Sequence, residues 1–566
     1  MIPTDGGEAR RITSMPISAS SPKFTPDGRR IVFVSAILDG FESLEATKKE
    51  LEAREKSKAK VRVTENRIYR YWDAWLTDGE QMRLFSVDLE GGKPVDLLPG
   101  WKGLFDLIDS GQTIDFDLSP DGASIAFAAN VVPAPYRTSN KDVFVMPLAG
   151  GTPRNLTKDN PAEDSSPRWS PNGKTLAFGR ETKGDGYPDR TRLALLDVAS
   201  GRVEVLTEAW DNVPSGWQFT ADGKTLVFKA EVRARTGLYT LPVSGGTPKQ
   251  LLRGGTVGGM EVSSKDEILF SLSTFETAPE IHLLPLAGGT PKPVSQVNDA
   301  LMAKFAFGRV EDVTFPGAGG DDVQMFILYP PDFTPTKKWP LVHMIHGGPV
   351  GTFGDGWSYR WNPQLFAAPG YVVAMVNFHG SSSFGQKWVE SILGAHADKP
   401  FTDVMKATDF LLAKGFVDEK RMAAAGGSYG GYLVNWIAGH TDRFASLISH
   451  AGVYSLHGQM ASDGTLGRQH SYGGFPFTNL ENVEKWSPNR FSKNFTTPML
   501  VLHGEKDYRV PVTQGLELYG NLQAKGVPSR LVYFTEENHW VLKGQNSVKW
   551  YGEVLGWLAR WFEKGR

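Results

Sequence analysis

A short turn sequence recurs at nearly regular intervals through the first 300 residues, and this repeat limits the folds open to the chain more than any other feature. Each copy places Asp-Gly, Asn-Gly or a degraded equivalent before an apolar run that favours a β-strand. The turn residues are Asp27, Asp121, Asn172, Asp222 and Asp266, and the last four lie 51, 50 and 44 residues apart. Asp-Gly and Asn-Gly supply the positive φ angles that tight hairpins require. A period of about 40–50 residues with several short strands per unit predicts a β-propeller.

A second repeated sequence, an apolar strand ending in Gly-Gly or Ser-Gly, supports this fold. It occurs at 143–151, 193–201, 241–246 and 283–289. Both sequences keep their order in every unit, which favours the propeller over a β-sandwich with accidental turn similarity. We count about five full units, and residues 1–13 match only the end of a further one. The propeller is therefore expected to be incomplete, with part of its N-terminus missing.

One unit carries an insertion near residues 41–78. Residues 42–60 are rich in Glu and Lys at a spacing of four, which predicts an exposed helix, and an aromatic stretch follows at 69–75. The insertion is either a solvated excursion on the rim or a lid that reads the end of a ligand.

The pattern changes near Gly308. Strand-like runs at 325–329 and 341–345 now alternate with helical patterns such as 403–414 and 548–564. This alternation predicts a doubly wound, mostly parallel α/β sheet. We expect a multidomain chain with a β-propeller over residues 1–308 and an α/β domain over residues 309–566.

Composition excludes several classes of function. The 566 residues have a net charge of −2 and contain no Cys, so a basic surface for nucleic acid, disulfides, thiolate nucleophiles and Cys-ligated metals are not expected. No run of 18 apolar residues indicates a membrane span, and no metal or cofactor is expected. The first residues lack a signal-peptide pattern, so the chain as it stands suits the cytoplasm, whereas a lost upstream signal would place it in the periplasm or outside the cell.

Ser428 is the candidate nucleophile. It lies in Gly426-Gly-Ser-Tyr-Gly-Gly431, which fits G-x-S-x-G. A run of small strand-like residues precedes it and a helical pattern follows, so the serine is expected at an exposed turn on the carboxyl edge of the sheet.

The candidates for the acid and the base follow in the order of α/β-hydrolases. Asp507 comes just after the strand 499–504, and His539 comes after the strand 530–534. Glu505 is the rival for the acid, and His503 is interpreted as a structural residue at a strand end. The backbone N–H groups of Tyr429 and Gly348 are the expected oxyanion donors.

These motifs resemble those of the prolyl oligopeptidase family of serine peptidases, and within it those of acylaminoacyl peptidases and dipeptidyl-peptidase-5-like enzymes. The matching segments are His346-Gly-Gly-Pro349, Gly426–Gly431, Asp507 with Val510-Pro511, His539, and Asn377–Gly385. The resemblance implies that Ser428, Asp507 and His539 form a triad, and that a propeller covers it and restricts substrates to short peptides. His379 stands where the family usually has Arg, and Ser383 where it usually has Gly, which puts the contacts of that loop in doubt.

The resemblance implies hydrolysis through an acyl-enzyme, with release of N-terminal dipeptides as the expected mode. Release of blocked N-terminal residues and general oligopeptidase activity are the alternatives, and a carboxylesterase or a non-catalytic propeller scaffold are more distant ones. Tyr429, Val453, Tyr454 and Tyr508 are expected to form an apolar P1 pocket, although Val453 and Tyr454 are core residues in the alternative interpretation.

A dipeptidyl peptidase also needs carboxylates for the substrate α-ammonium, and the insertion offers Glu42, Glu45, Glu65 and Asp73. The expected partners are short peptides, with no nucleic acid and no membrane, and a homo-oligomer is left open.

Overall fold

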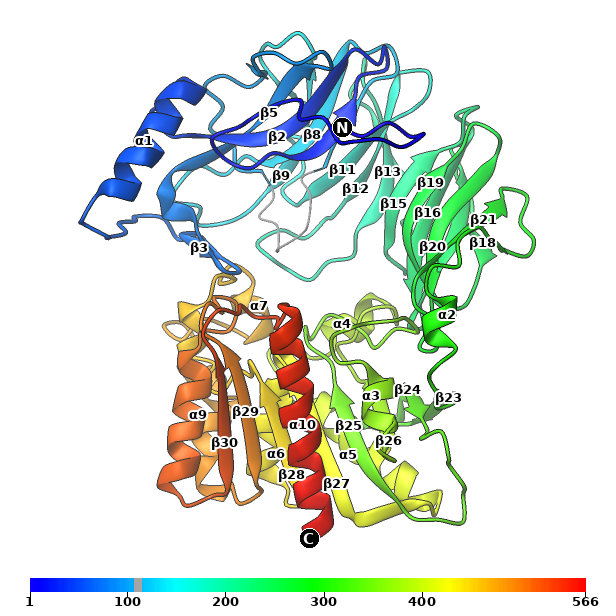
Figure 1. The fold of residues 1–566 in the computed structure, drawn as a ribbon, viewed down its shortest axis with the longest axis vertical. Helices are drawn as coiled ribbons and strands as arrows, with labels where there is room; N and C mark the ends of the chain where they lie inside the picture. Colours follow the sequence, from blue (N-terminus) through cyan, green and yellow to red (C-terminus); the bar gives the residue numbers. More distant parts are fainter. Residues whose placement is uncertain (106–114, 566) are drawn as a thin grey trace. The chain divides into compact units, whose positions relative to one another are not determined.

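The first half of the chain folds into four-stranded antiparallel sheets that resemble propeller blades, as predicted (Figure 1). The computed structural model describes residues 1–105 and 115–565. Three sheets are separate, in the orders β1-β2-β5-β6, β10-β9-β8-β7 and β11-β12-β13-β14. Two further groups, β15–β18 and β19–β22, form one eight-stranded sheet through a parallel contact between Thr236 and Thr256.

The strands of this half are β1 (Ser20–Phe24), β2 (Arg30–Leu38), β3 (Arg70–Tyr71), β4 (Ala74–Trp75), β5 (Glu80–Asp88), β6 (Val95–Asp96), β7 (Phe116–Leu118), β8 (Ser124–Asn130), β9 (Lys141–Pro147), β10 (Arg154–Asn155), β11 (Asp164–Trp169), β12 (Thr175–Arg180), β13 (Arg192–Asp197), β14 (Val203–Val205), β15 (Pro214–Phe219), β16 (Thr225–Val232), β17 (Arg235–Pro242), β18 (Lys249–Leu252), β19 (Thr256–Val262), β20 (Glu267–Ser273), β21 (Glu280–Pro285) and β22 (Lys292–Pro293).

The repeated turns connect β1 to β2, β7 to β8, β11 to β12 and β15 to β16. In the last of these, the Asp222 carboxylate accepts hydrogen bonds from the Thr220 hydroxyl at 2.7 Å and the Lys224 N–H at 3.0 Å. Gly223 follows with φ +71°, a conformation that glycine adopts without strain. The recurrence in the sequence therefore reflects a local requirement: a short acceptor side chain and a glycine close each hairpin.

The insertion in the first blade contains a helix, α1 (Leu44–Lys56), inside the range expected to be helical. Ser43 caps its N-terminus by accepting from the Ala46 N–H, and Glu50 forms an ion pair with Arg54 at 2.8 Å. Residues 1–13 form no strand, and their membership of a further blade stays a prediction.

The second half forms an eight-stranded mixed sheet in the order β23-β24-β26-β25-β27-β28-β29-β30. The contacts of β24 with β23 and β26 are antiparallel, and all pairs from β26 to β30 are parallel, so this part has the predicted α/β class. The strands are β23 (Val310–Pro316), β24 (Asp322–Leu328), β25 (Trp339–Ile345), β26 (Val372–Asn377), β27 (Val417–Gly427), β28 (Ser446–His450), β29 (Met499–Gly504) and β30 (Ser529–Phe534). The helices are α2 (Asp299–Met302), α3 (Pro363–Ala367), α4 (Gln386–Glu390), α5 (Asp398–Ala413), α6 (Tyr429–His440), α7 (Arg468–Ser471), α8 (Leu480–Lys485), α9 (Thr513–Ala524) and α10 (Gly544–Lys564).

Helices cover both faces of this sheet (Figure 1). Along β27, Met422 and Ala424 join the core formed with α5, α6 and α9, whereas Ala423 and Ala425 join the core formed with α3 and α10. This alternation is the two-residue period of a strand, and because both faces of the sheet are covered at its centre, β25 and β26 are buried along their whole length.

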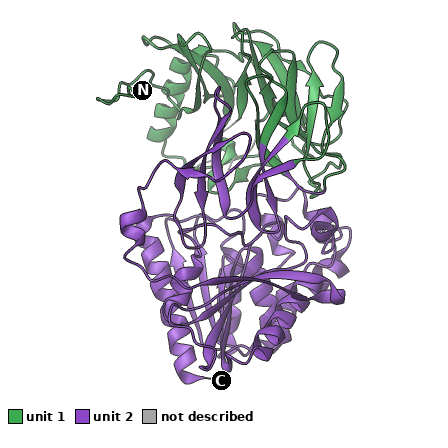
Figure 2. Ribbon diagram, turned by 90° about the vertical axis from the view of Figure 1, so that its right-hand side faces the viewer, with its two compact units in different colours: residues 1–210, 214–227, 241–248 green, residues 211–213, 228–240, 249–566 purple. Residues whose placement is uncertain are grey.

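The chain divides into two compact units (Figure 2). Unit 1 comprises residues 1–210, 214–227 and 241–248, and unit 2 comprises residues 211–213, 228–240 and 249–566. Unit 2 therefore holds strands of the last blades together with the α/β sheet, and the division at 308/309 stays a prediction. Within the described residues, no helix combines the length and apolar character that a membrane crossing requires.

Leu558 offers a test of the α10 core. It is fully buried, so Leu558→Ala should lower the free energy of unfolding by about 2–5 kcal/mol. Val548 lies on the same helix with 71% of its surface exposed, so Val548→Ala should change it by about 0.5 kcal/mol or less. Urea denaturation followed by tryptophan fluorescence measures both, and equal losses would contradict the assigned packing of α10.

Candidate active site

Ser428 lies at a sharp turn between β27 and α6, as predicted. Its backbone has φ +60° and ψ −119°, outside the regions that non-glycine residues normally occupy. Its N–H donates to the carbonyl of His450 at 2.9 Å. The turn requires glycine at 430, because a Cβ there would overlap the carbonyl oxygen of Ile345. Strain of this kind persists only where the surroundings fix it, and it is common at functional sites.

Asp507 and His539 are brought together at the carboxyl ends of β29 and β30. The Nδ1 of His539 is 2.7 Å from Oδ2 of Asp507, and both side chains are buried. Because an ionised carboxylate only accepts hydrogen bonds, Nδ1 of His539 carries the proton, and the lone pair on Nε2 is the one that can act as a base. Burial alone would raise the pKa of Asp507, but the His539 and His503 imidazoles outweigh it and hold that pKa well below its usual range. Glu505, the rival for the acid, is exposed.

His503, interpreted from the sequence as a structural residue, contacts Asp507 of this pair directly. Its Nε2 lies 3.2 Å from Oδ2 of Asp507 and 2.8 Å from the carbonyl of Val510. Both neighbours are acceptors, so Nε2 carries a proton and donates to them. The N–H of Val510 donates to the other oxygen of Asp507 at 2.8 Å, so both carboxylate oxygens are held in place.

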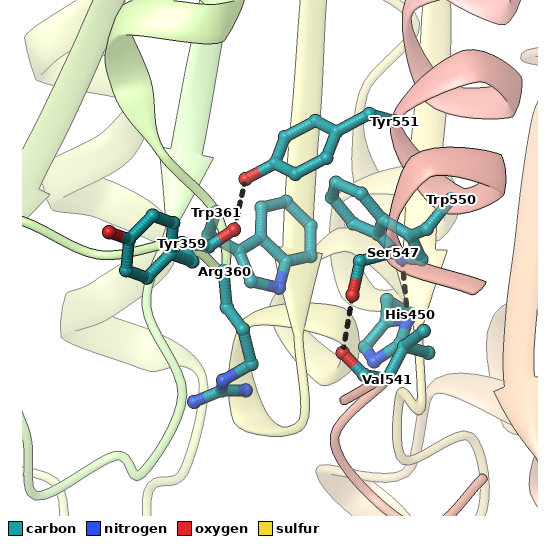
Figure 3. Close-up of a pocket in the computed structure, with 8 residues that line it drawn as sticks. All are labelled: Tyr359, Arg360, Trp361, His450, Val541, Ser547, Trp550 and Tyr551. Carbon is teal, nitrogen blue, oxygen red and sulfur yellow. Dashed lines mark hydrogen bonds between the residues drawn. The ribbon is translucent and has the colours of Figure 1, made fainter. Parts of the chain in front are cut away.

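His450 also contacts His539, and sequence reasoning missed it. Trp550 of α10 donates its indole N–H to Nδ1 of His450 at 3.1 Å (Figure 3). Burial lowers the pKa of His450 to about 3, so its ring is neutral at physiological pH. Nε2 therefore carries the proton and faces the carbonyl of His539 at 3.4 Å. No local signal could reveal this contact, because Trp550 is 100 residues from His450.

The loop after β25 lies against Ser428. A Cβ on Gly347 would be 3.3 Å from the Cβ of Ser428, and Gly348 follows with φ +127°. His346 fixes the loop: its Nδ1 donates to the carbonyl of Gly347 at 2.8 Å and its Nε2 accepts from Ser381 at 2.8 Å. Burial lowers the pKa of His346 to about 4, which keeps this ring neutral. The role of the Gly348 and Tyr429 N–H groups as oxyanion donors stays a prediction.

A pocket of about 310 Å³ opens beside Ser428 and His539. Its lining is formed by Phe275, Ile345, His346, Gly347, Thr352, Phe353, Gly354, Gly356, Ser358, Arg360, Trp361, Pro363, Met375, Gly427, Ser428, His450, His539 and Trp540. The volume lies at the lower end of the range for small-molecule sites, so the pocket suits a short group rather than a long chain.

The residues predicted to form the P1 pocket lie outside the lining of the 310 Å³ pocket. Val453 and Tyr454 belong to the buried core, where Tyr454 is fully enclosed and its hydroxyl accepts from Asn521 at 3.2 Å. Tyr429 is also buried and donates its hydroxyl to the carbonyl of His396 at 2.6 Å. None of these three, nor Tyr508, lines the 310 Å³ pocket. Their contact with substrate stays a prediction.

The segment that follows the glycine loop is held by strands of the last blades, within unit 2. The Asp355 carboxylate accepts from the N–H groups of Gly255 at 3.3 Å and Phe275 at 3.2 Å, and it lies 3.8 Å from Nε of Arg235. Glu231 of β16 accepts from the hydroxyls of Thr352 and Ser382. These contacts fix the wall of the pocket.

His379, which departs from the resembled pattern, is a structural anchor. Its Nδ1 and its backbone N–H each lie 2.8 Å from Oδ2 of the buried Asp403, and its ring stacks on Trp388. Ser383 accepts from the N–H of Ala234 at 3.0 Å. Among residues 1–105 and 115–565, no group of three or more His, Asp or Glu side chains is arranged to hold a metal ion.

The chain matches known proteins in sequence and in fold. A family model described as the prolyl oligopeptidase family matches residues 357–565. The chain is 30% identical over 562 residues to a dipeptidyl-peptidase 5 of Porphyromonas gingivalis, covering 96% of this chain and 80% of the relative. It is 31% identical over 537 residues to that of Aspergillus fumigatus, covering 88% and 74%.

Among solved structures, the acylaminoacyl peptidase of Pyrococcus horikoshii matches with a TM-score of 0.76 at 20% identity, covering 96% of this chain and 81% of that chain. This likeness confirms the fold class, a propeller-like N-terminal part followed by an α/β-hydrolase.

The reactivity of Ser428 tests the Asp507–His539 pair. A fluorophosphonate probe should label Ser428, and Asp507→Asn should slow labelling by up to about 10⁴-fold, because the amide no longer holds the imidazole in its productive tautomer. Glu505→Gln is the matched control and should label at the wild-type rate. Labelling kinetics followed by mass spectrometry measure the effect, and slowing by Glu505→Gln instead would transfer the acid role to that residue.

Proposed function

The chain belongs to the prolyl oligopeptidase family of serine peptidases, and from this we propose that it releases N-terminal dipeptides from short peptides through an acyl-enzyme. The observation that carries the proposal is the hydrogen bond between Asp507 and His539, together with the pocket that His539 and Ser428 line. The dipeptidyl mode is supported by relatives named dipeptidyl-peptidase 5, whose sequences match most of this chain.

In this mechanism, Nε2 of His539 takes the hydroxyl proton of Ser428 as Oγ bonds to the scissile carbonyl carbon. The carbonyl oxygen becomes an oxyanion, and the N–H groups of Tyr429 and Gly348 stabilise it. When the tetrahedral intermediate collapses, the C–N bond breaks and His539 passes the proton to the leaving amine. Water then attacks the acyl-enzyme with the same base, which releases the dipeptide and restores Ser428.

Asp507 orients and stabilises the imidazolium that forms transiently. Its pKa is held below the usual range, so it is ionised at physiological pH. His503 and the Val510 N–H satisfy its other lone pairs, and His450 steadies the backbone of His539. These contacts keep the base in place between proton transfers.

Release of a blocked N-terminal residue is the second candidate. Among the described residues, no carboxylate lines the 310 Å³ pocket, so this pocket does not itself bind an α-ammonium group. In the dipeptidyl mode, the ammonium must instead be bound by carboxylates outside this pocket, for which Glu42, Glu45, Glu65 and Asp73 remain the predicted candidates.

The nucleophile is tested by Ser428→Ala. Loss of the hydroxyl should lower kcat on a dipeptide anilide by about 10⁴-fold or more. Ser391→Ala is a matched control, since this hydroxyl donates to the carbonyl of Trp388 at the end of α4. Release of nitroaniline measures both, and near-normal turnover by Ser428→Ala would refute the mechanism.

The exopeptidase mode is tested by blocking the substrate. A dipeptide p-nitroanilide with a free α-ammonium should be cleaved with a kcat/KM at least about tenfold above that of its acetylated counterpart, because an ammonium–carboxylate contact is lost in the latter. A preference for the acetylated substrate would replace the dipeptidyl mode with the acylaminoacyl one.

A further inference from the structure

The pocket beside Ser428 has an unusual charge balance. Arg360 is the one permanently charged side chain among the described residues that line it, and these include no carboxylate. His346 and His450, which also line it, are kept neutral by burial, which lowers the pKa of each to about 4 and about 3 respectively. The carboxylates of Glu231 and Asp355 stand behind the wall and are hydrogen-bonded to Thr352, Ser382, Gly255 and Phe275, so Arg360 is the charge that a ligand in the pocket meets directly.

Arg360 has no ionic partner among the described residues. It is partly buried, and its guanidinium lies 4.3 Å from the ring centre of Trp540. No ion pair or hydrogen bond of this guanidinium is found in the described part of the chain. In Figure 3 its guanidinium points away from Tyr551 and Trp550. Burial lowers the pKa of Arg360 to about 10, so it keeps its charge at physiological pH.

The position of Arg360 indicates the leaving-group side of the scissile bond. Trp540, on which it stacks, directly follows His539. In a serine peptidase the histidine donates its proton to the leaving amine, so the wall of the pocket beside it lies on the leaving-group side. The predicted acyl-side residues Val453 and Tyr454 are absent from this wall.

We propose that Arg360 binds a carboxylate of the leaving group, in the first place the free C-terminal carboxylate of a leaving amino acid or dipeptide. A guanidinium matches a carboxylate through two parallel N–H···O bonds, and a partly buried site strengthens them. The volume of about 310 Å³ is enough for a leaving group of one or two residues, whose C-terminal carboxylate would then lie within the pocket. The enzyme is then selective for tripeptides and tetrapeptides, which rests on the peptidase function proposed above.

The test compares a tripeptide ending in Gly with the same tripeptide as its C-terminal amide. In the wild type, kcat/KM should be about tenfold or more higher for the free acid. Arg360→Gln should bring the acid-to-amide ratio close to one. Arg360→Lys should retain part of the preference, because lysine keeps the positive charge but cannot form two parallel hydrogen bonds to the carboxylate. A wild-type ratio near one, or an unchanged ratio in Arg360→Gln, would overturn the proposal.

A third substrate, the tripeptide amide with Asp in place of Gly, separates the two sources of a carboxylate. An Arg360-dependent preference for it over the Gly amide would assign the site to an acidic side chain. Arg560→Gln is the matched control: Arg560 also stacks on a tryptophan, Trp561, but lies on the exposed side of α10. A changed ratio in Arg560→Gln would show that the effect is not local to the pocket and would overturn the assignment.

The acyl side is varied separately, so that the two proposals fail independently. If only N-acetylated substrates are cleaved, the dipeptidyl mode fails, yet the acid-to-amide ratio of an acetyl-residue-Gly pair still tests Arg360. If dipeptides are released with an acid-to-amide ratio near one, the dipeptidyl mode stands and the role of Arg360 is lost.

Discussion

The backbone of Ser428 is held at φ +60° by a buried parallel strand on one side and a buried helix on the other, and the rest of the site depends on this turn. His450 connects the turn to the base. Its carbonyl accepts from the N–H of Ser428, and its ring, fixed by Trp550, faces the carbonyl of His539. One residue at the end of β28 thus positions the nucleophile and the base together. Proton transfer from Ser428 to His539 requires a precise distance between the two side chains. A single residue that supports both fixes this distance better than two separate supports would.

Burial keeps four histidines of the second half neutral. It lowers the pKa values of His343, His346, His396 and His450 to about 3 or 4. His539 differs from these four because its Nδ1 is hydrogen-bonded to a carboxylate, that of Asp507. Among the described residues that line the pocket, Arg360 carries the permanent positive charge.

Features that depend on local sequence were predictable. The blade turns follow from a short acceptor side chain before a glycine, and the strand–turn–helix at Ser428 follows from small residues around the serine. The order of Ser428, Asp507 and His539 could be read because parallel strands deliver their carboxyl ends to one edge.

Features that depend on contacts distant in sequence were not predictable. Trp550 meets His450 across 100 residues, and Glu231 meets Ser382 across 151. The burial of Tyr454 depends on the packing around it, which no local pattern records. The contact of His503 with Asp507 is close in sequence, but it requires the turn after β29 to fold back on the strand.

Asp355 has a consequence for how such chains can be recombined. Its carboxylate is satisfied by Gly255, Phe275 and Arg235, which all precede the α/β sheet in the sequence. A fragment or chimera that begins after residue 308 would carry Asp355 without those donors, and Thr352 and Ser382 without Glu231. The segment that forms the pocket wall would then lose the hydrogen bonds that hold it. The smallest unit that can be exchanged between such chains is therefore larger than the α/β sheet. It must also include the strands that support the pocket wall.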